Sequence, residues 1–253
     1  MKLYKICFSP TGGTNKVSDI LASGLSDEVI TIDLTEGKTD FSDISLEKNS
    51  IAIIAAPSYG GRLPGPAVQR LASIQGNHAK AIIVCVYGNR AYEDALIELQ
   101  DTAKQANFHV LAAVAAVAEH SIARQFASGR PDTLDQKQLL KFDQEILSKI
   151  NNDDLSEPKV PGNRPYKEKG AAGMIPARTE NCVKCGLCAE KCPVQAIDKT
   201  NPQKVDKKIC ISCMRCVSIC PHSACKVNSL MLSAVNMMLK KVCINRKENE
   251  LYL

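Results

Sequence analysis

The chain has 253 residues, of which 45% are hydrophobic and 23% charged, a composition that excludes a disordered chain, collagen and a coiled coil. This length allows one or two compact domains. No apolar run reaches the roughly 18 to 20 residues that cross a bilayer, and residues 1–16 lack the apolar core of a signal peptide. We therefore expect a cytoplasmic protein with no membrane insertion.

The net charge of +5 is distributed unevenly along the chain. Residues 1–150 carry 15 Lys and Arg against 17 Asp and Glu, whereas residues 151–253 carry 17 against 10. A basic half can indicate nucleic-acid binding. However, eight of the twelve cysteines lie between Cys182 and Cys220. Without a secretory signal, this density favours bound metal over disulfides, and we expect no nucleic-acid partner.

Residues 1–150 alternate short apolar runs with helical patterns. Runs typical of buried parallel strands occupy residues 4–9, 51–56, 81–87 and 110–118, and a weaker one occupies 29–33. The alanine-rich run 110–118 is also compatible with a helix. Amphipathic helices are expected around residues 17–25, 95–103 and 133–150, the last starting at a capping box of Thr133 and Gln136. This alternation predicts an α/β doubly wound domain with a five-stranded parallel sheet.

A loop rich in glycine and hydroxyl groups joins the first predicted strand to the first helix. It consists of Ser9, Pro10, Thr11, Gly12, Gly13 and Thr14. N–H groups at a helix N-terminus attract anions and hydroxyls add neutral donors, so the loop suits a terminal phosphate. It lacks the lysine of a Walker A motif and the glycine spacing of a dinucleotide fingerprint. The alternative is an ordinary strand-to-helix turn.

The pattern S-x-T-G-x-T resembles the FMN phosphate loop of flavodoxins, and the strand alternation over residues 1–150 is similar to theirs. The resemblance implies FMN at the carboxyl ends of the strands. The flavin ring would then contact the loops after the third and fourth strands: Pro57, Ser58, Tyr59, Gly60, Gly61 and Arg62, and Gly88, Asn89, Arg90 and Tyr92.

Individual roles follow from this resemblance. Tyr59 and Tyr92 would flank the ring, because the chain has no Trp. Gly60 or Gly61 would turn a carbonyl toward flavin N5 on reduction. Arg62 would balance the charge of the reduced flavin.

His120 follows the last predicted strand, where loops face a ligand in this architecture. Two roles are compatible with that position. One is catalytic, with contact to flavin or substrate. The other, which is commoner for such a histidine, is to cap its own loop by hydrogen bonding.

Residues 151–175 have no apolar periodicity and contain Pro158, Pro161 and Pro165, which predicts a linker. A flexible linker would set how often the two flanking domains meet. The domain that follows, residues 176–227, is too small to build a core unaided, so bound metal is expected to hold it together.

Two identical cysteine runs lie in this second domain. Each reads C-x2-C-x2-C-x3-C-P, and they contain Cys182, Cys185, Cys188 and Cys192, and Cys210, Cys213, Cys216 and Cys220. Three thiolates of a run hold one 4Fe-4S cluster, while its fourth cysteine ligates the other cluster. We therefore assign one cluster to Cys182, Cys185, Cys188 and Cys220, and its mate to Cys210, Cys213, Cys216 and Cys192. Zinc, the alternative, favours paired CxxC knuckles with a longer spacer.

This domain resembles two-cluster bacterial ferredoxins, and the whole chain resembles flavodoxin–ferredoxin fusions of anaerobic bacteria. Within residues 228–253 we expect a helix over 229–241, which packs on protein rather than on a membrane, and a tail. The resemblance implies electron transfer between FMN, two 4Fe-4S clusters and redox partner proteins or a small-molecule acceptor. The alternatives are an FMN-dependent reductase of a quinone or nitro compound, with His120 or Tyr59 as proton donor, and an iron–sulfur redox sensor.

Overall fold

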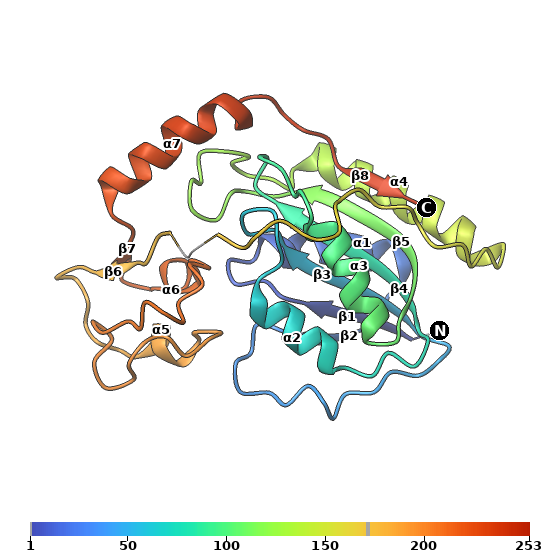
Figure 1. Ribbon diagram of the computed structural model, residues 1–253, viewed down its shortest axis with the longest axis horizontal. Helices are drawn as coiled ribbons and strands as arrows, with labels where there is room; N and C mark the ends of the chain where they lie inside the picture. Colours follow the sequence, from blue (N-terminus) through green and yellow to red (C-terminus); the bar gives the residue numbers. More distant parts are fainter. Residues whose placement is uncertain (1, 171–172) are drawn as a thin grey trace.

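The computed structural model describes residues 2–170 and 173–253. Its first domain contains five parallel strands, which are β1 (Leu3–Cys7), β2 (Val29–Asp33), β3 (Ile51–Pro57), β4 (Lys80–Tyr87) and β5 (His109–Val117). They lie in the order β2-β1-β3-β4-β5, as Figure 1 shows. This order is that of flavodoxin-like doubly wound sheets. The predicted fold class is therefore confirmed, and the alanine-rich run is a strand.

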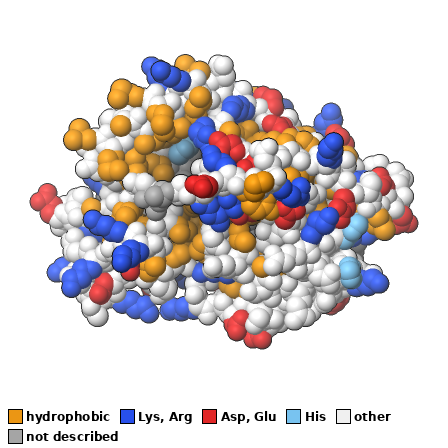
Figure 2. All heavy atoms as spheres, in the orientation of Figure 1, with side chains coloured by type: hydrophobic (Ala, Val, Ile, Leu, Met, Phe, Trp, Pro, Cys, Tyr) orange, Lys and Arg blue, Asp and Glu red, His pale blue; other side chains and the backbone are white. Residues whose placement is uncertain are grey.

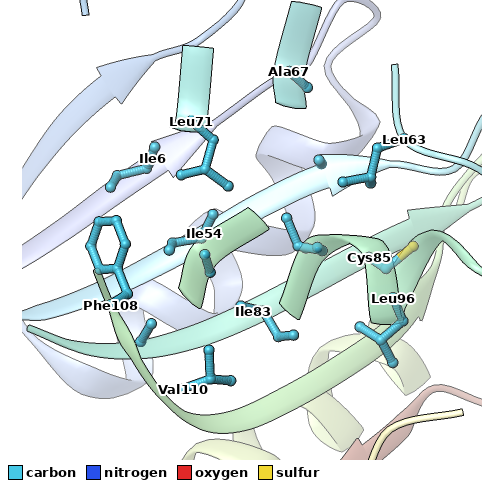
Figure 3. Packing of buried hydrophobic residues seen from close by; sticks show 14 of the residues in the cluster. Ile6, Ile54, Leu63, Ala67, Leu71, Ile83, Cys85, Leu96, Phe108 and Val110 are labelled. Carbon is cyan, nitrogen blue, oxygen red and sulfur yellow. The ribbon is translucent and has the colours of Figure 1, made fainter. Parts of the chain in front are cut away.

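Helices cover both faces of this sheet. On one face, α1 (Gly13–Leu25) and α4 (Thr133–Asn151) pack on the sheet and form the first hydrophobic core. On the other face, α2 (Gly65–Ser73) and α3 (Ala95–Gln105) form the second core. All of β3 is buried, because a central parallel strand is covered twice. Figure 3 shows the second core, where strand side chains such as Ile54 and Ile83 meet Leu71 of α2 and Leu96 of α3.

Two local expectations need correction. The sequence analysis did not predict α2, whose only buried residues are Ala67 and Leu71, too few to give a clear apolar face. The capping box of α4 begins one residue earlier than expected, because Asp132 is the N-cap and exchanges hydrogen bonds with Asp135. Thr133 is the first residue of the helix itself.

The C-terminus returns to the first domain. After α7 (Ser229–Cys243), the short strand β8 (Glu250–Tyr252) pairs antiparallel with β5, so the sheet has six strands rather than five. The buried Asn249 side chain fixes this return, since its Oδ1 accepts the Val117 N–H at 2.9 Å. Its Nδ2 donates to Asp135 of α4. Residues that were expected to form a tail therefore complete the sheet edge.

The linker is not a flexible tether. Residues 157–169, which we call the strap, lie along α3 and its N-cap and bond to them through both backbone and side chains. The Pro158 carbonyl accepts from Gln100 at 2.9 Å, and Val160 is buried. Further bonds join the strap to two aspartates: Asn163 and Lys167 to Asp94, and Arg164 and Tyr166 to Asp101. Residues 157–169 of the predicted linker therefore follow a fixed path on the first domain.

The second domain consists of two similar halves. Its elements are α5 (Leu187–Glu190), α6 (Arg215–Ser218) and the antiparallel pair β6 (Ala177–Arg178) and β7 (Cys225–Lys226). Its small core consists largely of the cysteines and Ala189, Ala196 and Ile197. So few apolar residues leave most of its stability to bound metal.

The helix α7 packs on the first domain through one side only. Leu239 and Cys243 contact Ala123 and Phe126, which agrees with the expected packing on protein. Its outer side carries exposed apolar residues, including Leu230 and Met237, and Figure 2 shows hydrophobic side chains gathered over this helix. In the described part of the chain, none of the helices is both long and apolar enough to cross a membrane.

A buried carboxyl between α1 and α4 should make stability depend on pH. Asp143 lies against Gly24, where an added Cβ would approach its Oδ2 to 2.1 Å. Among the described residues its oxygens have no hydrogen-bond partner, and burial raises the pKa of Asp143 to about 8. The unfolded pKa is about 3.9. The wild type therefore loses stability as the pH rises from about 4 to about 8, because the carboxyl is ionised in the unfolded chain and must take up a proton on folding.

We expect Asp143→Asn, which is neutral at every pH, to gain stability relative to the wild type as the pH rises. The gain should be about 1.4 kcal/mol per pH unit between about pH 4 and pH 8. Urea unfolding of both proteins at several pH values measures it. A difference that stays constant with pH would mean that the Asp143 carboxyl is ionised in the fold.

Candidate cofactor sites

The eight cysteines of the two runs surround two separate cavities. One is lined by Cys182, Cys185, Cys188 and Cys220, with Cys225 also on its wall, and the other by Cys192, Cys210, Cys213 and Cys216. Each cavity thus combines three cysteines of one run with the fourth of the other run, the same sets that the sequence analysis assigned. In the described residues, no three His, Cys, Asp or Glu side chains meet at a single-ion position.

The two cysteine loops share a backbone conformation. Lys184 and Gly186 in the first run have positive φ, and so do their counterparts Ser212 and Met214 in the second. Gly186 and Met214 are the N-caps of α5 and α6. Non-glycine residues adopt this conformation at a cost. Because the same conformation occurs in both runs with different residues, the cysteine spacing, rather than the intervening residues, accounts for the loop conformation.

The sequence analysis missed a buried cation between the two cavities. The Arg178 guanidinium donates to the Cys188 sulfur at 3.3 Å. Burial lowers the pKa of Arg178, but the bond to Cys188 and the nearby cysteines outweigh this effect, so the pKa is raised. Cys225, whose role the sequence left open, is buried in the core of this domain, at the position that Ile197 occupies in the first half. Cys7 and Cys85 are buried in β1 and β4 of the first domain.

The loop between β1 and α1 is ordered by its own side chains. The Ser9 hydroxyl accepts the Asn15 N–H at 2.9 Å, and the Ser9 N–H donates to Thr35 at 2.8 Å. Gly12 is the N-cap of α1 with φ +89°, which glycine adopts freely. It offers no side-chain cap, and no acidic residue lies in the first turn. In the first turn of α1, the Asn15 N–H is therefore occupied by Ser9, whereas the Gly13 and Thr14 N–H groups have no capping side chain among the described residues.

A cavity of about 400 Å³ adjoins this loop. Its wall is formed by both domains: Cys7, Ser9, Pro10, Thr11, Gly12, Asn15, Thr31 and Asp33 from the first, and Arg215, Ser218 and Ile219 from the second. A second cavity, of about 340 Å³, extends from Thr11 and Gly13 to Glu119 and Ser121 and is again closed by the second domain. The glycine loop therefore lies at the interface between domains.

The loop after β3 forms a tight turn with two positive φ values. Tyr59 and Arg62 exchange backbone hydrogen bonds around Gly60 and Gly61. The Gly61 carbonyl already accepts the Asp94 N–H at 3.0 Å. The sequence analysis expected either Gly60 or Gly61 to turn its carbonyl toward the flavin. Gly60 is exposed and Gly61 is buried, so the Gly60 carbonyl is the better candidate for this rotation. Burial, together with the nearby Cys213 thiol, raises the pKa of Tyr59.

The loop after β4 is bound to the C-terminal segment. The buried Asn89 donates to the carbonyls of Cys243 and Asn245 at 2.9 and 2.8 Å. The Tyr92 hydroxyl bonds to Glu250 at 2.6 Å and to Tyr252 at 2.8 Å, and burial with these partners raises its pKa. The side chains of Asn89 and Tyr92 thus anchor residues 243–252, a role that the sequence analysis did not predict. Arg90 pairs with Glu93 within its own loop.

Arg62 is held between the strap and α3. Its guanidinium forms two hydrogen bonds to Glu98, at 2.9 and 2.8 Å, donates to the Lys167 carbonyl, and lies over the Tyr166 ring. Burial opposes ionisation of Glu98, but the bonds from Arg62 and Leu63 keep its pKa low. The Arg62 charge is therefore already balanced by a buried carboxylate.

We expect Arg62→Ala to lower the free energy of unfolding by about 2 kcal/mol, because Glu98 loses its charged hydrogen-bond donor. Urea unfolding measures this loss. A redox titration of the same variant tests the charge-balancing role inferred from the sequence. An unchanged flavin midpoint potential would remove Arg62 from the flavin site.

His120 caps its own loop. The ring Nδ1 accepts hydrogen bonds from the backbone N–H groups of Ile122 and Ala123 at 3.2 and 3.1 Å. The backbone N–H of His120 donates to the Phe126 carbonyl. The ring packs against Gly88, where an added Cβ would lie 2.6 Å from it. Burial and the nearby Arg90 lower the pKa of His120. These contacts correspond to the capping role, and the catalytic role stays a prediction.

Direct contacts dock the two domains at the carboxyl edge of the sheet. Arg215, which lies between Cys213 and Cys216, donates to the Pro10 carbonyl at 3.3 Å. Arg70 of α2 donates to the Pro193 carbonyl, next to Cys192, and to the Leu34 carbonyl at 2.6 Å. The sequence analysis singled out neither arginine, because the partner of each in the other domain lies more than a hundred residues away in the chain.

Comparisons with known proteins agree with this division. Residues 181–224 match the family described as 4Fe-4S dicluster domain. A polyferredoxin protein of Methanothermobacter thermautotrophicus is 32% identical over 72 residues, which are 28% of this chain and 18% of that protein. A ferredoxin of Sorangium cellulosum is 26% identical over 70 residues, 25% of this chain and 69% of that protein. The chain thus spans less than a fifth of the polyferredoxin.

Among solved structures, a flavodoxin from the domain Archaea is similar at 12% identity with a TM-score of 0.43, covering 60% of this chain and 99% of that one. The two-electron reduced flavodoxin of Megasphaera elsdenii is similar at 13% identity with a TM-score of 0.41, covering 56% and 98%. The strand order established above identifies the fold independently. The chain therefore joins a first domain of flavodoxin-like fold to a 4Fe-4S dicluster domain.

Proposed function

We propose that the protein transfers electrons between bound FMN, its two 4Fe-4S clusters and external redox partner proteins. The observation that carries this proposal is the position of the second cysteine loop. Its Arg215 contacts the glycine loop at Pro10, and Arg215, Ser218 and Ile219 form part of the wall of the cavity at that loop. The candidate flavin site and one candidate cluster site therefore face each other across one interface.

The residues present fit a phosphorylated flavin. Thr11 and Thr14 supply hydroxyls, and the first turn of α1 supplies the Gly13 and Thr14 N–H groups without a competing acid. The adjoining cavity has room for a phosphate. We assign phosphate binding to this loop, contact with the flavin ring to Tyr59, and carbonyl rotation to Gly60.

When bound, FMN exchanges one or two electrons and each cluster exchanges one, so together they connect two-electron and one-electron carriers. The chain's own part is to keep the sites in place. The strap and the C-terminal strand, which flank the second domain in the chain, both bind the first domain. The interface contacts of Arg70 and Arg215 fix its orientation.

The test is anaerobic purification followed by an absorption spectrum and iron, sulfide and flavin analysis. We expect one FMN and two 4Fe-4S clusters per chain, and flavin reduction by a one-electron donor that reacts with the clusters. Iron-loaded protein without flavin would leave a ferredoxin on a scaffold. Colourless protein, or protein that contains zinc instead of iron, would overturn the redox proposal.

The same preparation tests the two alternatives. A reductase predicts steady-state turnover of a quinone or nitro compound that is lost on His120 substitution. A sensor predicts partner binding that depends on the oxidised clusters. Electron transfer without either property would favour the carrier.

A further inference from the structure

One arginine connects the two candidate cofactor sites. Arg215 is the first residue of α6 and lies in the chain between Cys213 and Cys216. It lines the cavity of the second cysteine set and also the 400 Å³ cavity at the glycine loop. Its Nη1 donates to the Pro10 carbonyl at 3.3 Å, across the domain interface. A single side chain thus reaches from a cysteine loop to the loop that suits a phosphate.

The hydrogen-bonding capacity of this guanidinium is largely unused. Its Nε is buried, and among the described residues it has no hydrogen-bond partner. A buried donor without an acceptor is costly, and a guanidinium matches the geometry of phosphate oxygens. Asp33 also lines this cavity, but its carboxylate already accepts the Thr35 N–H at 2.7 Å.

The other arginines of the region are paired with acidic side chains, whereas Lys16, which lines the neighbouring cavity with them, forms no ion pair among the described residues. Arg124 and Arg130, which line the neighbouring cavity, form ion pairs with Glu119 and Asp135. Within the described residues, no acidic group lies within ion-pair distance of Arg215. Its charge is therefore available to an anion at the glycine loop.

The repeat within the second domain shows that an iron–sulfur loop does not require this arginine. The corresponding residue of the first run is Leu187, the first residue of α5, in a loop of the same backbone conformation. The first run does not line the cavities at the glycine loop. The arginine therefore occurs at this position only in the run that contacts the glycine loop.

We propose that Arg215 binds the phosphate of the flavin, so that the iron–sulfur domain supplies a cation to the flavin site. This inference rests on the proposed function. The phosphate would be held by the first turn of α1 and its threonines from one domain and by a guanidinium from the other. Flavin retention then depends on the loop that carries Cys213 and Cys216 being folded.

The experiment compares FMN with riboflavin, which lacks the phosphate. Protein with intact clusters is freed of flavin and titrated with each ligand by flavin fluorescence. Arg215→Gln should weaken FMN binding about 10- to 100-fold, the range for loss of a charged hydrogen bond, and change riboflavin binding less than about twofold. Arg215→Lys should restore part of the FMN affinity. Lys184→Gln, which removes a cation from the other cysteine loop, is the matched control and should leave both affinities unchanged.

Three results would contradict the inference. If wild type binds FMN and Arg215→Gln binds it equally tightly, the phosphate role is excluded while the proposed function stands. If Arg215→Gln with normal iron content loses FMN and riboflavin affinity in parallel, Arg215 only supports the interface. If wild type binds neither flavin, the proposed function fails and the inference fails with it.

Discussion

Cys192→Ala is expected to remove the cluster assigned mainly to the second cysteine run and to leave the other intact. Cys192 lines one cavity with Cys210, Cys213 and Cys216, although Cys188, only one turn earlier, lines the other. A cubane needs four protein ligands of this kind, so loss of one thiolate destabilises the whole site. Iron and sulfide analysis should show about half of the wild-type content.

The sharpest comparison is between two neighbours on one loop. Cys188→Ala and Cys192→Ala should lose different clusters, so electron paramagnetic resonance spectra of the two reduced variants should differ. Cys192→Ala should match Cys210→Ala instead. Cys225→Val, which removes a buried thiol outside both predicted ligand sets, is the control and should keep full iron content. Identical residual spectra for Cys188→Ala and Cys192→Ala would overturn the crossed assignment.

Asp135→Ala is expected to destabilise the first domain by about 3 to 5 kcal/mol, the range for breaking a buried ion pair. Asp135 is fully buried and accepts two hydrogen bonds from Arg130, whose side chain is 4% exposed. It also accepts from Arg246 and Asn249, which bring the C-terminal segment back to the sheet. Its loss leaves the Arg130 charge buried without a carboxylate.

Urea unfolding measures this effect, with Glu47→Ala as the control. Glu47 pairs with Lys2 at the surface, so its removal should cost less than about 1 kcal/mol. Limited proteolysis of Asp135→Ala under native conditions should also cut faster after α7, because the segment that leads to β8 loses its bonds from Arg246 and Asn249 to Asp135. Equal stability of the two variants would show that the pair with Arg130 contributes little.

Much of the fold was predictable because its signals are local. A fully buried strand such as β3 must be continuously apolar, and Ile51–Pro57 has that pattern. The glycine loop was recognisable because its composition and its place between strand and helix occur together. The cysteine runs were the strongest signal, since both spacings are identical. Their grouping around two cavities required only the general rule on crossed ligation.

The remaining features depend on distant partners. β8 has only three residues and is held in place largely by Asn249, whose bond to Val117 spans 132 residues. The strap was predicted as flexible from its prolines, but its contacts with Asp94 and Asp101 of the α3 region give it a fixed path. Arg62 and Tyr92 were assigned to the flavin from loop position, whereas Glu98 and Glu250 engage them. No pattern within a short window identifies such partners.

The return of β8 to the edge of the sheet makes the iron–sulfur domain an insertion between α4 and the last strand rather than an appendage. The segments on both sides of this domain, the strap and β8, bind the first domain. A large displacement of the iron–sulfur domain would therefore strain both segments. Electron exchange inside the molecule should then be insensitive to solvent viscosity and to dilution, unlike exchange between a free flavodoxin and a free ferredoxin. Only the steps that involve outside partners would remain limited by diffusion.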